Sequence, residues 1–129
     1  MVSEGTGRKI LVVDDKEENR RLVRKLLTRH GYTVGEGASG EEALEVVERD
    51  RPDLVLMDIR LREGIDGIET TRRIKAMPSV SGIPVVAITA SVSPADVQRA
   101  LDCGCSGFIR KPIEIDEFPA QVAHYLATE

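Results

Sequence analysis

The stretch Lys9-Ile-Leu-Val-Val13, which ends at Asp14 and Asp15, most constrains how this chain can fold. A short apolar run that stops abruptly predicts a buried strand. In open α/β sheets, ligand sites lie outside the carboxyl ends of the strands. Two adjacent carboxylates there repel each other, so they suggest a compensating cation, and oxygen ligands select Mg²⁺ or Ca²⁺ over softer metals. The alternative is that the two acids simply cap the next helix.

Similar apolar segments recur along the chain and alternate with segments of helical periodicity. The third segment is followed by Asp58, the fourth ends in Thr89, and the fifth is followed by Lys111. The five predicted strands are Lys9 to Val13, Tyr32 to Glu36, Asp53 to Met57, Ile83 to Thr89 and Phe108 to Arg110.

Five strands that alternate with five helices predict an α/β fold, a three-layer doubly wound parallel sheet with helices on both faces. With right-handed crossovers, the flavodoxin-like strand order 2-1-3-4-5 is the common solution at this chain length. This order brings together the carboxyl ends of strands one, three, four and five. We therefore expect Asp14, Asp15, Asp58, Thr89 and Lys111 to face one crevice.

Two helices carry more specific expectations. Ser93-Pro94 resembles an N-cap followed by proline at the first helical position, opening a helix that buries Val97, Ala100 and Leu101.

The last helix contains Pro119, which cannot donate a backbone hydrogen bond. A start at Glu114 would place this proline too deep in the helix. We therefore predict a late start, near Asp116 or Glu117, with Asp116 as N-cap.

Length and composition bound the function. A chain of 129 residues predicts one domain, with residues 1–8 as a flexible polar tail and residues 9–129 as the folded unit. A net charge of −4 and a pI near 5.3 argue against nucleic-acid binding.

No apolar run approaches the roughly 20 residues of a membrane span, and no signal peptide is apparent, so we expect a cytoplasmic protein without a membrane partner. Cys103 and Cys105 lack the further ligands of a zinc site and are interpreted as packing residues.

The expected crevice suits phosphoryl chemistry. Asp14 and Asp15 would hold Mg²⁺, with Asp58 as the third acidic group. A carboxylate can itself act as the nucleophile and give an aspartyl phosphate. The ammonium of Lys111 and the hydroxyl of Thr89 would contact the remaining phosphoryl oxygens.

The set Val-Asp14-Asp15, Met57-Asp58-Ile, Thr89-Ala90 and Lys111-Pro112 resembles the response-regulator receiver domain of two-component signalling, from about Lys9 to the end of the chain. The resemblance implies that Asp58 accepts a phosphoryl group from a sensor histidine kinase or a histidine phosphotransfer protein. It also implies that Asp14, Asp15, Asp58 and the backbone carbonyl of Arg60 bind Mg²⁺, that Thr89 and Lys111 contact the phosphoryl group, and that Thr89 and Phe108 form the switch.

We expect the phosphorylated form to signal by altered binding of a downstream protein effector to the surface of the fourth helix, fifth strand and fifth helix. That surface includes Asp96, Arg99, Arg110, Glu117 and Gln121, and its mixed charge suits a protein partner rather than nucleic acid. The same resemblance implies a phosphoacceptor that slowly loses its own phosphoryl group, rather than an enzyme with a separate substrate.

The segment after Asp58 departs from the family pattern. The family's loop usually reads Asp-x-x-Met-Pro-x-x-Asp-Gly, whereas this chain has Asp58-Ile-Arg-Leu-Arg-Glu-Gly-Ile-Asp-Gly67. The loop is one residue longer, and Arg62 stands where the family has proline.

Three other functional classes match parts of this sequence less well. Gly35-Glu-Gly37-Ala-Ser-Gly40 matches a dinucleotide-binding fingerprint, but it follows the second strand instead of the first, so a glycine-rich turn is favoured. An aspartate-nucleophile phosphatase would need a second aspartate where Lys16 stands. An interaction module that is never phosphorylated would have no need of three acids in one crevice.

Overall fold

The computed structural model describes residues 7–90 and 93–127, so residues 1–6 of the predicted tail lie outside the described residues. The strands are β1 Lys9–Val13, β2 Thr33–Gly37, β3 Leu54–Asp58, β4 Val85–Thr89 and β5 Gly107–Arg110. The helices are α1 Glu17–Arg29, α2 Gly40–Asp50, α3 Gly67–Ala76, α4 Pro94–Asp102 and α5 Phe118–Ala127. Among these described helices, none is long and apolar enough to cross a membrane.

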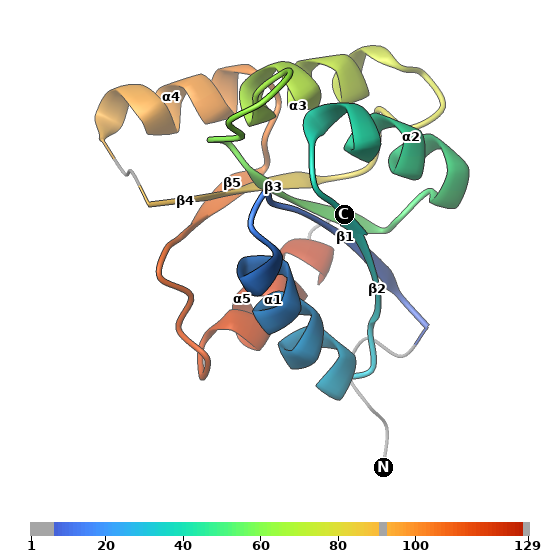
Figure 1. The fold of residues 1–129 in the computed structure, drawn as a ribbon, viewed down its shortest axis with the longest axis vertical. Coiled ribbons are helices and arrows are strands. Elements are labelled where there is room, and N and C mark those ends of the chain that lie inside the picture. The colour runs from blue at the N-terminus through green and yellow to red at the C-terminus, as the bar shows by residue number, and fades with distance from the viewer. Residues whose placement is uncertain (1–6, 91–92, 128–129) are drawn as a thin grey trace.

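The strands form one parallel sheet in the order β2-β1-β3-β4-β5, which confirms the predicted topology. Helices α2, α3 and α4 cover one face of the sheet, and α1 and α5 cover the other (Figure 1). The central strands β3 and β4 are buried along their whole length, whereas the edge strand β2 is partly exposed. The apolar runs noted in the sequence are therefore the strands that are covered on both sides.

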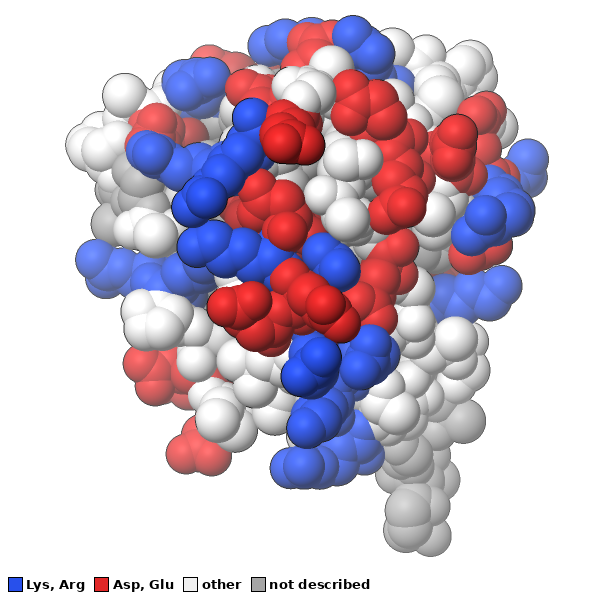
Figure 2. All heavy atoms as spheres, viewed as in Figure 1, with Lys and Arg blue, Asp and Glu red and all other residues white. Residues whose placement is uncertain are grey.

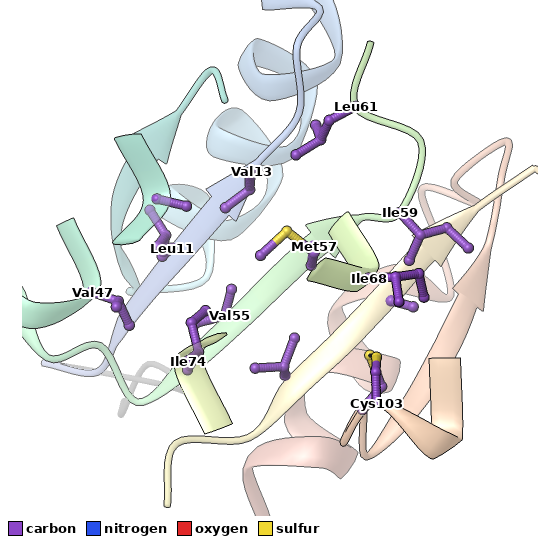
Figure 3. Packing of buried hydrophobic residues seen from close by; sticks show 14 of the residues in the cluster. Leu11, Val13, Val47, Val55, Met57, Ile59, Leu61, Ile68, Ile74 and Cys103 are labelled. Carbon is purple, nitrogen blue, oxygen red and sulfur yellow. Dashed lines mark hydrogen bonds between the residues drawn. The ribbon is translucent and has the colours of Figure 1, made fainter. Parts of the chain in front are cut away.

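Alternate residues of each strand enter two separate cores. Leu11 and Val13 pack with α2, α3 and α4 in the cluster drawn in Figure 3, while Ile10 and Val12 pack against α1 and α5. This division holds the sheet between two apolar layers.

Cys103 and Cys105 are buried members of the first core, which confirms their interpretation as packing residues. Burial, reinforced by the neighbouring Cys103, raises the pKa of the Cys105 thiol to about 12. The thiolate, which is the reactive form, is therefore scarce at neutral pH.

Three helices begin at side-chain caps that the sequence indicates. The hydroxyl oxygens of Ser39 and Ser93 accept hydrogen bonds from backbone N–H groups of their helices at 3.1 and 3.2 Å, and the carboxylate of Asp66 does so at 2.8 Å. These caps fix where α2, α4 and α3 start. For α3, the cap also fixes the end of the loop that follows Asp58.

The predicted burial of α4 is wrong in part. Ala100 is buried, but Val97 is only half-buried and the side chain of Leu101 is 45% exposed. Successive helical residues are rotated by about 100°, so when the small Ala100 faces the sheet its neighbour Leu101 faces solvent.

Helix α5 begins at Phe118, one or two residues after the predicted start and with Pro119 in its first turn. The N–H of Phe118 donates to the carbonyl of Glu114 at 2.8 Å, so a single turn precedes the helix. Asp116 lies within that turn and not at the cap position. Pro119 thus lies in the first turn of α5, where backbone N–H groups have no acceptor within the helix, so its missing N–H costs no helical hydrogen bond.

The glycine-rich segment covers the end of β2 and the first residue of α2. A Cβ on Gly40 would overlap the Thr70 hydroxyl and lie 2.6 Å from Cγ1 of Ile65, so the first turn of α2 lies directly against the start of α3. The segment belongs to an edge strand of the sheet. Close packing therefore explains Gly40 without a dinucleotide.

Candidate functional site

The register of the sheet brings the acidic residues together. Val13 pairs with Met57 across β1 and β3, so Asp14 and Asp58, the residues that follow them, are neighbours. Carboxylate oxygens of Asp14, Asp15 and Asp58 all lie within 4.8 Å of one another. Asp14 and Asp58 are buried, and Asp15 is half-buried. Three mutually repelling carboxylates at this spacing need positive charge among them.

Lys111 supplies part of that charge. Its Nζ lies 3.0 Å from Oδ2 of Asp14 and 3.2 Å from Oδ2 of Asp58. Burial alone would lower the pKa of Lys111, but the hydrogen bond to Asp14 and the charges of both aspartates outweigh it and raise the pKa above its ordinary value. The lysine is therefore a fixed cation at neutral pH, and it bridges the ends of β1 and β3.

Asp14 is held in place by the start of α1. Its Oδ1 accepts from the backbone N–H of Lys16 at 2.9 Å, and its Oδ2 accepts from the Asn19 amide at 3.2 Å. A guanidinium nitrogen of Arg20 donates to the backbone carbonyl of Asp14 at 2.6 Å. With Lys111 added, three donors reach this carboxylate. Lys16 is the cap residue of α1, and this helix has no side-chain cap hydrogen bond, so the alternative that Asp14 and Asp15 cap it is wrong.

Asp58 and Asp15 instead border an open pocket. The pocket has a volume of about 720 Å³ and is bordered by Asp15, Asp58, Arg60, Arg62 and Lys111, among others. The backbone N–H of Arg60 donates to Oδ1 of Asp58 at 2.9 Å, and that of Arg62 donates to Oδ2 of Asp15 at 3.1 Å. A ligand that enters this pocket meets the carboxylate of Asp58 beside the ammonium of Lys111.

Thr89 and Phe108 occupy neighbouring strands. Thr89 is buried at the end of β4, and its carbonyl accepts from the N–H of Lys111 at 2.8 Å. The next residue, Ala90, borders the pocket beside Asp58, whereas Thr89 is not among the described residues that line it. Phe108 is half-buried against the first core, and its carbonyl accepts from the Tyr125 hydroxyl at 3.4 Å. The carbonyl of Thr89 is thus linked to the backbone of Lys111, and the carbonyl of Phe108 is linked to the side chain of Tyr125 in α5.

Sequence reasoning missed three contributions to the site. The amide of Asn19 and the guanidinium of Arg20 each contact Asp14. Both residues follow Asp14 and Asp15 by about one helical turn, and this spacing could have indicated the contacts. The guanidinium of Arg60 lies 3.5 Å from Asp96 of α4, which links the pocket to that helix. A surface ion pair of this kind has no sequence motif that would predict it.

The charges on this face are mixed. Figure 2 shows acidic side chains near the centre of the view, with lysine and arginine side chains to their left and below them. A uniformly basic surface, which nucleic-acid binding requires, is not seen on this face.

Comparison with known proteins decides the family. The model of the response regulator receiver domain matches residues 10–123. The chain belongs to this family. It is 38% identical over 117 residues to the polar-differentiation response regulator DivK of Brucella anthropi, covering 91% of this chain and 94% of that one.

Solved structures agree with this assignment. A putative response regulator from Chloroflexus aurantiacus matches with a TM-score of 0.87 and 30% identity, covering 93% of this receiver domain and 98% of that chain. The signal receiver domain of a histidine kinase from Syntrophus aciditrophicus matches with a TM-score of 0.85 and 31% identity, covering 95% and 92%. The receiver domain described here is thus a signalling domain of two-component systems.

Proposed function

We propose that Asp58 is the phosphoacceptor of this receiver domain and takes its phosphoryl group from the phosphohistidine of a sensor histidine kinase or a histidine phosphotransfer protein. The observation that carries the proposal is the position of the Asp58 carboxylate, which borders the pocket and lies 3.2 Å from the Lys111 ammonium. Asp14 is a poorer nucleophile because three donors already reach its oxygens. Asp15 has no contact with Lys111 among the described residues.

During transfer, one oxygen of Asp58 forms a P–O bond while the P–N bond of the phosphohistidine breaks and its electron pair stays on the imidazole. Lys111, already bound to Asp58, can follow the charge onto the phosphoryl oxygens. The N–H of Arg60 keeps the Asp58 carboxylate oriented. Later hydrolysis returns the free carboxylate.

The donor set fits Mg²⁺. The ion would be held by Asp14, Asp15, Asp58 and the backbone carbonyl of Arg60, and this assignment is supported by the three carboxylates within 4.8 Å. When bound, Mg²⁺ neutralises charge on the phosphoryl oxygens. All four residues come from the ends of β1 and β3 or the loop that follows β3.

Acetyl phosphate can replace the protein donor in a test of this function. We expect one added phosphoryl group by intact mass when the protein is incubated with acetyl phosphate and Mg²⁺, and none when EDTA removes the metal. Equal phosphorylation with and without EDTA would contradict the Mg²⁺-dependent reaction.

The output proposed here is a change in protein binding at the surface of α4, β5 and α5, in the cytoplasm. Phosphorylation replaces the single negative charge of the Asp58 carboxylate with a phosphoryl group that carries about 1.5 to 2 negative charges beside the ends of β3 and β4. Thr89 moves toward the new oxygens, and Phe108 turns inward into the space this leaves. The proposal is supported by the backbone hydrogen bond between Thr89 and Lys111, by the ion pair of Arg60 with Asp96 on α4, and by the exposed apolar side chain of Leu101.

Amide hydrogen exchange with and without beryllofluoride, a phosphoryl mimic, tests this output. We expect altered exchange in α4 and β5 as well as in the loops around Asp58, because Thr89 and Phe108 lie on adjacent strands. Changes confined to the loops around Asp58 would exclude the proposed switch and leave the phosphoacceptor role intact.

A further inference from the structure

The loop between β3 and α3 reaches back to one acid of the site. The backbone N–H of Arg62 donates to Oδ2 of Asp15 at 3.1 Å, across 47 positions of the sequence. Within residues 7–90 and 93–127, no second donor reaches this carboxylate. Asp14, in contrast, is held by donors from its own helix and by Lys111. The orientation of the Asp15 carboxylate therefore depends on a distant loop.

That loop is fixed at several points on either side of Arg62. The side chain of Leu61 is buried in the core, and the N–H of Ile65 donates to Oε2 of Glu41 on α2 at 3.1 Å. Gly64 makes the turn between them with a φ of +72°, a conformation that glycine adopts without strain. The loop that carries the N–H of Arg62 is thus anchored on both sides. This loop therefore does not have to become ordered when a ligand binds.

We propose that the backbone N–H of Arg62 positions the Asp15 carboxylate for Mg²⁺. One oxygen of Asp15 is engaged by the N–H, which leaves the other oxygen available to the ion or its water. Donors to ligating carboxylates commonly contribute 10- to 100-fold to metal affinity. Proline, which the family pattern places here, has no N–H to give, so the longer loop of this chain supplies a contact that the usual loop sequence lacks. The inference rests on the proposed Mg²⁺ site.

The experiment compares Mg²⁺ binding by calorimetry in the wild type, Arg62→Pro and Arg62→Ala. Both substitutions remove the guanidinium, but alanine keeps the backbone N–H. We expect Arg62→Pro to bind Mg²⁺ about tenfold more weakly, and Arg62→Ala to stay within about threefold of the wild type because an exposed charge is screened. Urea unfolding of each variant shows whether it remains folded. An ester in place of the amide at residue 62 removes the N–H without the proline ring and should weaken binding in the same way.

Each outcome bears on a different claim. Equal Mg²⁺ affinity in the wild type, the ester and Arg62→Pro would overturn the positioning role while the proposed metal site stands. Equal weakening in Arg62→Ala and Arg62→Pro would assign the effect to the side chain and overturn the role of the N–H. Failure of the wild type to bind Mg²⁺ would overturn the proposed metal site, and this inference with it.

Discussion

Replacing Asp58 by asparagine should abolish phosphorylation by acetyl phosphate and Mg²⁺. Asparagine has nearly the same volume and can still accept the hydrogen bond from the N–H of Arg60, but its amide is not a nucleophile for phosphorus. The expected result is one added phosphoryl mass on the wild type and none on Asp58→Asn.

The matched control is Asp102→Asn, which changes an exposed aspartate at the end of α4. Asp102 accepts a hydrogen bond from Gln98 and does not border the pocket that Asp58 lines. This variant should be phosphorylated like the wild type. A stable phosphoryl group on Asp58→Asn would show that another residue is the acceptor.

Gly67→Ala should cause the largest loss of stability among alanine substitutions at the glycines whose surroundings the structure describes. A Cβ at this position would overlap the backbone carbonyl of Asp58 and lie 2.5 Å from Cα of Ile59. Both obstacles are backbone atoms of the segment that carries Asp58, so neither can move aside without distorting the site. We expect the free energy of unfolding to fall by about 3 kcal/mol, measured by urea denaturation.

Gly82→Ala is the control for this substitution, because a Cβ there meets no atom within 4 Å. Its free energy of unfolding should stay within about 1 kcal/mol of the wild type. If the two variants were equally stable, the close approach of α3 to the end of β3 would not be a structural requirement.

Most of the fold could be predicted because burial leaves a strong mark on the sequence. Strands β3 and β4 are covered on both faces and appear as continuous apolar runs, and the serine and aspartate caps mark the starts of three helices. The bounds of β1 were predicted correctly, but several other strand bounds were displaced by one or two residues, so that Asp58 is the last residue of β3 and not the first after it. The exposure of Leu101 was missed because periodicity shows that a helix has an apolar face but not how much of it the sheet covers.

The acidic site was also within reach of the sequence, because parallel strands place their carboxyl ends at the same edge of the sheet. The structure brings Asp14, Asp15, Asp58 and Lys111 together as that rule requires. The backbone donors that orient these groups could not be foreseen. A backbone N–H such as that of Arg62 exists at every residue other than proline, so its use depends on the path of the loop.

Locating the phosphoryl group on the wild-type chain tests the central claim most directly. Borohydride reduces an aspartyl phosphate to homoserine, and tandem mass spectrometry of the digested protein then identifies the altered residue. After treatment with acetyl phosphate and Mg²⁺, we predict homoserine at position 58 and aspartate at positions 14 and 15. Homoserine at either of those two positions, or an unaltered Asp58 in a phosphorylated protein, would contradict the account.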